Sequence, residues 1–167
     1  MPDEVLLSQE IGRLLKLKGL WLATAESCTG GLLGHLITSI YGSSEYYLGG
    51  FIAYSNFAKE RFLNVSSVTL KSFGAVSRET VLEMARGARE AFKEEQDISR
   101  IIGVSVSGIA GPAGGSSEKP VGTVWIGISS ALGDDAICFY FEGDRGEIKA
   151  QSARQALELL KNQLNRI

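Results

Sequence analysis

One segment, residues 20–40, constrains the fold of this chain more than any other. Residues Leu20 to Ala23 form an apolar run, and residues 20–25 have the length of a short strand. Ser27 and the pair Gly30-Gly31 interrupt the run, after which apolar residues recur with helical spacing at positions 32, 33, 36, 37 and 40. A strand that leads through a glycine turn into a helix is typical of α/β proteins. The segment therefore predicts an α/β fold in which Ser27 stands at a strand–helix junction.

The remaining sequence continues this alternation and then changes to a hairpin. Helices are predicted over residues 5–17, 30–40, 56–63, 68–72, 77–92 and 146–164, and strands over residues 20–25, 46–54, 100–107, 121–130 and 136–142. A loop is predicted over residues 108–120 and a hairpin turn over residues 132–135. We expect one domain over residues 1–167: a three-layer α/β/α sandwich with a mixed, mostly parallel sheet of about five strands.

The composition excludes several classes of protein. The formal net charge is −2 and the basic residues form no block, which argues against a nucleic-acid-binding protein. No apolar run approaches the ~20 residues of a membrane span, and the acidic start is unlike a signal peptide. Cys28 and Cys138 lie far apart and match no disulfide or zinc pattern. We expect a cytoplasmic protein with no metal, no cofactor, no nucleic-acid partner and no membrane contact.

Ser27 is a candidate nucleophile because it precedes the predicted start of a helix. The unpaired N–H groups of a helix N-terminus favour negative charge, so a hydroxyl there lies beside a ready oxyanion site. A helix-capping serine is the plainer interpretation. The sequence lacks the Gly-x-Ser-x-Gly pattern of a nucleophile elbow. The single histidine, His35, lies two helical turns further on, over about 10 Å along the helix, which disfavours a Ser-His-Asp triad.

Because His35 lies too far from Ser27, the general base has to be a lysine whose pKa is lowered by burial or by a neighbouring positive charge. Lys59 is the best candidate, because it follows Tyr54 at the end of a predicted strand, and strand ends converge at one edge of an α/β sheet. An exposed lysine and a tyrosine that merely ends a strand are the alternatives. Cys28 is a less favoured nucleophile than Ser27, and Glu26 fits equally well as a site acid and as a carboxylate at the helix start.

A third strand end leads into the glycine-rich stretch Ser107 to Gly115, whose N–H groups are suited to hold a phosphate or an oxyanion. It matches neither a Walker motif nor a dinucleotide fingerprint, and ordinary turns are the alternative. Lys119 and Arg145 are candidate phosphate partners, with solvated surface charges as the alternative. Asp144 is a candidate cap for the last helix.

Several short motifs occur in one order and together carry a family resemblance. They are Ala25-Glu26-Ser27-Cys28-Thr29-Gly30-Gly31, Gly42-Ser43-Ser44, Gly49-Gly50, Tyr54-Ser55 with Lys59, Gly74-Ala75-Val76-Ser77, Met84-Ala85, Gly108-Ile109-Ala110-Gly111-Pro112, Lys119-Pro120-Val121-Gly122-Thr123 and Gly143-Asp144-Arg145. From about residue 5 to 165 the chain resembles the CinA C-terminal domain family, the nicotinamide-nucleotide amidases. It is similar to the stand-alone form of that family, without the molybdopterin-binding-like domain of the larger members.

The resemblance implies hydrolysis of nicotinamide mononucleotide to nicotinate mononucleotide and ammonia, as part of pyridine nucleotide recycling. It implies that Ser27, Tyr54 and Lys59 are the catalytic residues, and that the protein is a homodimer or a higher homo-oligomer. The substrate-binding residues that we expect are Thr29, Gly30, Gly31, Ser44, Ser107, Gly108, Ala110, Gly111 and Arg145. The backbone of the first three would stabilise the oxyanion, and the others would hold ribose and phosphate.

Two departures from the family pattern and two alternative functions complete the prediction. Ser107 stands where members commonly have threonine, and Lys149 stands where arginine is usual. A lysine offers a phosphate a point charge in place of a two-pronged fork. The alternatives to the amidase are a non-catalytic nucleotide-binding module and an amidase for a different small amide.

Overall fold

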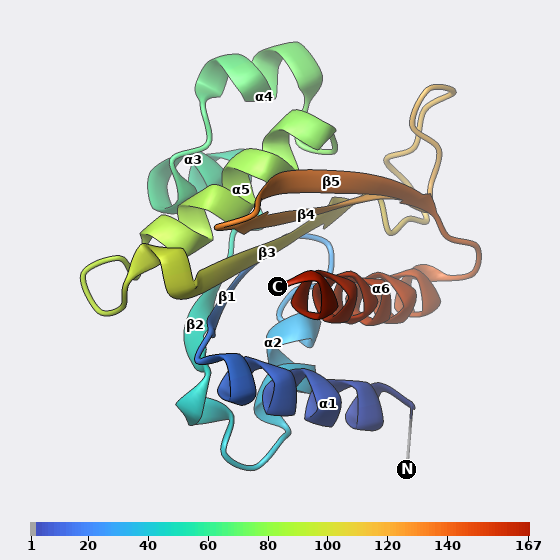
Figure 1. Cartoon of the computed structure of the whole chain (residues 1–167). Helices are drawn as coiled ribbons and strands as arrows, with labels where there is room; N and C mark the ends of the chain where they lie inside the picture. Colours follow the sequence, from blue (N-terminus) through green and yellow to red (C-terminus); the bar gives the residue numbers. More distant parts are fainter. Residues whose placement is uncertain (1–2) are drawn as a thin grey trace.

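The computed structural model describes residues 3–167, which form a five-stranded sheet with helices on both faces (Figure 1). The strand order is β2-β1-β3-β4-β5. The strands are β1 (Trp21–Glu26), β2 (Tyr47–Ile52), β3 (Ile101–Gly108), β4 (Thr123–Ser130) and β5 (Gly133–Tyr140). The helices are α1 (Asp3–Lys18), α2 (Leu32–Thr38), α3 (Asn56–Leu63), α4 (Ser67–Phe73), α5 (Arg78–Glu90) and α6 (Arg145–Arg166), with short 3-10 turns at Ser43–Glu45 and Ile98–Arg100.

The sheet is mixed, as predicted, but parallel pairs do not predominate. β1 pairs in parallel with β2 and with β3, whereas β3–β4 and β4–β5 are antiparallel. Parallel neighbours need a crossover connection, which α2 supplies between β1 and β2. Between β3 and β4 the chain returns through a loop without a helix, so β4 runs against β3. The predicted α/β class and the number of strands are confirmed.

Two hydrophobic cores lie on opposite faces of the sheet. One is formed with α1, α2 and α6 and the other with α3, α4 and α5 (Figure 1). Side chains alternate between the two faces along a strand. In β1, Leu22 accordingly belongs to the first core, and Ala23 and Ala25 belong to the second. Helix α5 approaches β3 closely because Gly103 has no side chain: a Cβ atom there would lie 2.1 Å from the carbonyl oxygen of Ala85.

Side chains cap the starts of α5 and α6, and the cap of α6 is the one that the sequence predicts. The Ser77 hydroxyl accepts a hydrogen bond from the Thr80 N–H at 3.2 Å, at the start of α5. The Asp144 carboxylate accepts from the Glu147 N–H at 2.9 Å, and the Glu147 side chain accepts in return from the Asp144 N–H. This reciprocal capping box fixes the entry into α6.

The β4–β5 hairpin turns earlier than predicted. Ser130 pairs with Gly133, so Ala131 and Leu132 form the turn and the two aspartates that follow belong to β5. Glycine enables this, because residue 133 adopts a φ of 111° that other residues rarely adopt. Asp134 and Asp135, which fall in the predicted turn, are therefore strand residues that pair with Ser129 and Ile128.

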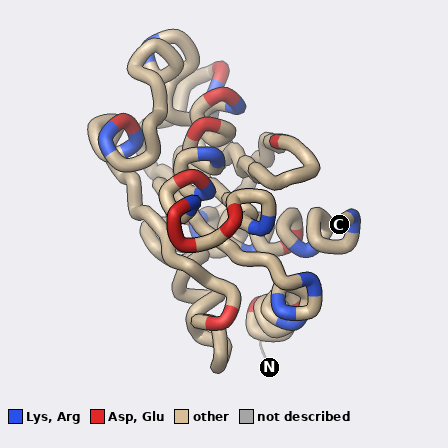
Figure 2. The backbone as a smooth tube through the Cα atoms, turned by 60° about the vertical axis from the view of Figure 1, so that its left-hand side comes forward, with Lys and Arg blue, Asp and Glu red and all other residues tan. Residues whose placement is uncertain are grey.

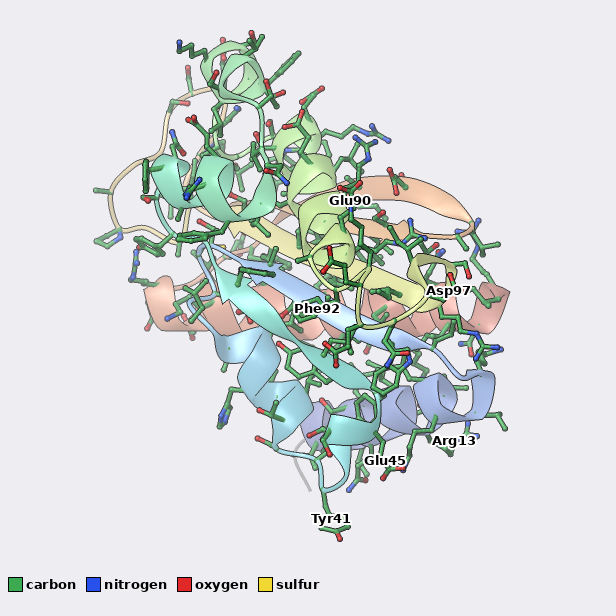
Figure 3. The ribbon with its side chains drawn as sticks, turned by 90° about the vertical axis from the view of Figure 1, so that its left-hand side faces the viewer. Arg13, Tyr41, Glu45, Glu90, Phe92 and Asp97 are labelled. Atoms are coloured by element: carbon green, nitrogen blue, oxygen red, sulfur yellow. The ribbon has the colours of Figure 1, made fainter. Side chains whose placement is uncertain are left out.

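Strand β2 makes a close approach to the chain at Gly49, one of its two adjacent glycines. Figure 3 shows Phe92 over this strand, and its ring lies 6.2 Å from that of Phe51, centroid to centroid. A Cβ atom at Gly49 would lie 3.2 Å from the Phe92 ring. The strand also shifts register against β1 between Leu22 and Ala23, so β2 combines an irregularity with a close approach.

Charges of both signs are interspersed along the chain (Figure 2). Within residues 3–167, no helix combines the length and the apolar character that a membrane crossing requires. The same residues contain no group of three or more His, Cys, Asp or Glu side chains that is placed to hold a metal ion.

Candidate active site

The site lies where β1, β2 and β3 end. Ser27 follows β1 directly, and its N–H donates to the carbonyl oxygen of Val106 in β3 at 2.9 Å. The side chain is 8% exposed. The chain then turns through Gly30 and Gly31, with φ values of 61° and 102°, before α2 begins. These left-handed conformations explain why the turn contains glycine.

Lys59 is brought to Ser27 by the first turn of α3. Its Nζ donates to the Ser27 Oγ at 3.1 Å, to the Ala53 carbonyl at 2.9 Å and to the Tyr54 carbonyl at 3.3 Å. The side chain is 1% exposed. Burial disfavours the charged form and lowers the pKa of Lys59 from 10.5 to about 8. The predicted meeting of Ser27 and Lys59 is therefore present in the structure.

These contacts suit a neutral amine as well as an ammonium ion. A neutral Lys59 retains two N–H bonds, which the carbonyls of Ala53 and Tyr54 can accept. Its lone pair then faces the third neighbour, the Ser27 hydroxyl. A hydroxyl that donates to a buried amine is an activated nucleophile.

Tyr54 contributes differently from what the sequence suggested. Its carbonyl, rather than its phenol, contacts Lys59. The phenol is at the mouth of the site and accepts a hydrogen bond from Arg145 Nη2 at 2.9 Å, while Arg145 Nη1 donates to the Gly111 carbonyl at 2.7 Å. Arg145 thereby joins the end of β2 to the glycine-rich loop.

These residues surround a pocket of about 210 Å³. The lining consists of Ser27, Cys28, Tyr54, Lys59, Ala75, Val76, Ser107, Gly108, Ala110 and Arg145. A larger cavity of about 430 Å³ lies between the β4–β5 hairpin and the end of α6, but its lining contains no pairing of a nucleophile with a base. The smaller pocket is therefore the candidate active site.

The comparisons with known proteins show which family the chain belongs to. The model of the CinA C-terminal domain matches residues 5–164. The chain belongs to the CinA C-terminal domain family. It is 49% identical over 153 residues to the nicotinamide-nucleotide amidohydrolase PncC of Enterobacter agglomerans, covering 91% of this chain and 90% of that protein.

Longer and structurally characterised members of the CinA C-terminal domain family are also similar. A relative from Moorella thermoacetica is 48% identical over 158 residues, but the chain spans only 37% of its length. The crystal structure of a CinA superfamily protein from Klebsiella pneumoniae has a TM-score of 0.90 at 32% identity and covers 99% of both chains.

The sequence predicted an oxyanion site at the start of α2, but Glu26 already accepts hydrogen bonds from the N–H groups there. This carboxylate is 2% exposed and accepts from the N–H groups of Gly31 at 3.0 Å, Leu33 at 3.1 Å and Gly34 at 2.8 Å. The Gly30 N–H donates to the Ser27 carbonyl at 3.1 Å. Gly30 and Gly31 are therefore unavailable as oxyanion donors. Of the two roles expected for Glu26, site acid or carboxylate at the helix start, the structure shows the second.

Thr29 and Ser44 also lie outside the pocket lining. Thr29 is buried, and its hydroxyl finds no hydrogen-bond partner within residues 3–167. Ser44 lies in the 3-10 turn that precedes β2. Because β1 and β2 are parallel, Ser44 is at the opposite end of the sheet from Ser27. The family resemblance led us to expect Ser44, in the motif Gly42-Ser43-Ser44, at the substrate. In the structure, Gly42 adopts a φ of 82° and starts the 3-10 turn instead.

The glycine-rich stretch enters the site through its first residues. Ser107, Gly108 and Ala110 line the pocket, and Gly111 reaches it through the bond from Arg145. The Ser107 hydroxyl donates to the Ala75 carbonyl at 2.8 Å, so it anchors a neighbouring wall. Lys119 does not line the pocket and donates to the Phe73 carbonyl at 2.7 Å.

Sequence reasoning missed two lining residues, Ala75 and Val76, and ranked a third, Cys28, behind Ser27. Ala75 and Val76 carry no reactive group, and only the recurrent motif Gly74–Ser77 pointed to them. Cys28 lines the pocket beside the preferred serine, but burial raises the pKa of its thiol to about 11, which disfavours the nucleophilic thiolate.

Proposed function

We propose that this protein is an amidohydrolase that cleaves the carboxamide of nicotinamide mononucleotide, giving nicotinate mononucleotide and ammonia in pyridine nucleotide recycling. The decisive observation is the buried Lys59 amine at 3.1 Å from the Ser27 hydroxyl, at the wall of a pocket. The substrate is inferred from the relatives that are named nicotinamide-nucleotide amidohydrolases. From the family resemblance we also infer a cytoplasmic homo-oligomer.

In the first half-reaction, neutral Lys59 takes the proton of the Ser27 hydroxyl while Oγ attacks the carboxamide carbon. The carbonyl oxygen becomes an oxyanion in the tetrahedral intermediate. Lys59 then returns the proton to the nitrogen, the C–N bond breaks, and ammonia leaves behind a Ser27 ester. The lowered pKa of Lys59, about 8, supports this exchange, because such an amine both accepts and releases a proton near neutral pH.

In the second half-reaction, water replaces the serine. Lys59 removes a proton from the water, whose oxygen attacks the ester carbon, and the proton is passed to Ser27 Oγ as the ester bond breaks. Nicotinate mononucleotide is released and the starting state returns.

The oxyanion requires donors other than those at the start of α2. Within residues 3–167, the backbone N–H groups of Cys28 and Thr29 donate to no other residue, and both follow the nucleophile directly. We assign the oxyanion to these two groups. Tyr54, held by Arg145, closes the pocket mouth, while Ser107, Gly108 and Ala110 form the wall against the substrate.

The test is release of ammonia from nicotinamide mononucleotide by the purified protein and by the Ser27→Ala variant. We expect release by the wild type only, with unchanged circular dichroism, because removal of a nucleophile leaves the fold intact. Full activity of Ser27→Ala would exclude the mechanism. Absence of release from a folded wild type would favour a nucleotide-binding module, which would also tolerate Lys59→Ala.

A further inference from the structure

One wall of the pocket, formed by Ala75 and Val76, follows a helix that packs weakly on the rest of the molecule. Helix α4 buries a single side chain, that of Leu70, and lies at the outer edge of the structure (Figure 1). Its other apolar residues, Val68 and Phe73, are 68% and 49% exposed. Because α4 buries so little apolar surface, packing contributes little to fixing where the helix ends. The position of the wall therefore depends on polar contacts.

These contacts reach three successive carbonyl groups, those of residues 73–75. The first, on Phe73, accepts a hydrogen bond from Lys119 Nζ at 2.7 Å. The next two accept from the hydroxyls of Thr80 at 2.7 Å and Ser107 at 2.8 Å. The two hydroxyls belong to α5 and β3, whereas Lys119 belongs to the loop between β3 and β4. This loop is thereby joined to the end of α4.

The loop between β3 and β4 also forms part of the pocket, since Ala110 lines it. The loop folds closely on itself because it contains glycine: Cβ atoms at Gly111 and Gly115 would lie 2.5 Å and 2.7 Å from atoms of Val121. A contact made by Lys119 at the end of this folded loop is thus transmitted to Ala110. Lys119 links one wall of the pocket to another.

A lysine suits this contact, and its loss should act locally. Phe73 is the last residue of α4, and the final carbonyls of a helix lack partners within it, so lysine often donates to them. Within residues 3–167, Lys119 forms no ion pair that would compete for its ammonium. The hydrogen bond lies at the surface, where water can replace the ammonium. Removing Lys119 should therefore free the wall without unfolding the protein.

We propose that Lys119 is a positioning residue for substrate binding, which acts through the Phe73 carbonyl and holds the wall of Ala75 and Val76 in place against the loop. This inference rests on the proposed function and deepens it. A wall that is fixed before the substrate arrives lowers the ordering cost of binding. The effect should fall on KM, because the nucleophile and its base are held by other contacts.

The first experiment measures ammonia release from nicotinamide mononucleotide. We expect Lys119→Met to raise KM about 3- to 10-fold, the equivalent of one hydrogen bond, with kcat and its pH dependence unchanged. Lys119→Arg should keep a KM near that of the wild type, because its guanidinium can donate to the same carbonyl. Lys71→Met is the matched control: Lys71 lies in the last turn of α4, is exposed and, within residues 3–167, forms no ion pair.

The second experiment measures hydrogen–deuterium exchange without a ligand. The Gly74 N–H donates to the Leu70 carbonyl at 3.0 Å and reports whether the last turn of α4 is closed. Its exchange should be faster in Lys119→Met, while exchange in α5 and β3 stays at the rate of the wild type. An equal increase in all three elements would overturn the inference, because Lys119 would then contribute only to overall stability.

An unchanged KM in Lys119→Met, a loss confined to kcat, or a loss that Lys119→Arg does not restore would also overturn the inference. Calorimetry in the Ser27→Ala protein separates it from the proposed function, because this variant binds nicotinamide mononucleotide without turnover. Weaker binding when Lys119→Met is added to Ser27→Ala supports the role of Lys119 even if the wild type releases no ammonia, in which case the amidase function alone fails. Equal binding by the single and double variants would overturn the role of Lys119.

Discussion

The buried ammonium of Lys59 should weaken the fold in a way that depends on pH. Burial lowers its pKa from 10.5 to about 8, and this difference corresponds to about 3 kcal/mol. Between these two pH values the unfolded chain holds the proton and the folded chain does not, so stability rises with pH. Below about pH 8 both states are protonated and the full penalty remains.

Comparison of the wild type with Lys59→Met isolates this penalty. Methionine has a similar length and no charge, although it leaves the Ala53 and Tyr54 carbonyls without their donor. That loss does not depend on pH. In urea unfolding, the free energy of unfolding of the variant relative to the wild type should therefore fall by about 2–3 kcal/mol between about pH 7 and about pH 10.

A difference that stays constant over this range would refute the reasoning, because the ammonium would then carry no desolvation penalty. Lys161→Met serves as the control, since Lys161 is ion-paired with Glu10 and the pKa of its ammonium is raised. The same titration should appear in catalysis: kcat/KM should rise with pH and level off above about 8, where Lys59 is neutral.

Two further predictions concern the neighbours of Ser27. Glu26→Gln should destabilise the fold by about 2–3 kcal/mol in urea unfolding, because the new NH₂ group faces backbone N–H groups that donate to the carboxylate; an unchanged midpoint would contradict the capping role. Cys28→Ala should retain ammonia release, and native Cys28 should resist iodoacetamide at about pH 8, because its thiol is buried with a pKa of about 11. Loss of activity with an intact fold would instead point to a catalytic thiol.

The sequence predicted the Ser27–Lys59 pair because both residues sit at strand–helix junctions, and the topology of a parallel sheet brings such junctions together. The prediction from sequence failed where one side chain type suits two different roles. A carboxylate at position 26 suits a reaction as well as a helix start, and only the folded structure shows its three N–H donors. Asp134 and Asp135 were predicted as turn residues, but Arg86 and Arg78 pair with them and offset the low strand propensity of aspartate.

Motif resemblance failed differently, at Ser44. A shared motif records that a residue type recurs and leaves open whether the reason is chemical or conformational. Here Gly42 adopts a left-handed turn, and the serine lies at the far end of the sheet. Lys149 is the opposite example. The sequence analysis noted it only as a departure from the family pattern, but in the structure its ammonium lies beside Gly30, in the turn that follows Ser27.

The long sequence separations within the site link activity to the completion of folding. Ser27 and Lys59 are 32 residues apart, and Tyr54 and Arg145 are 91 residues apart. Contacts over such separations form late, because loop closure has to precede them. A chain still emerging from the ribosome without α6 has neither Arg145 nor the helix that covers one core. Newly made chains would thus lack a complete site until α6 has been synthesised and has packed against the sheet.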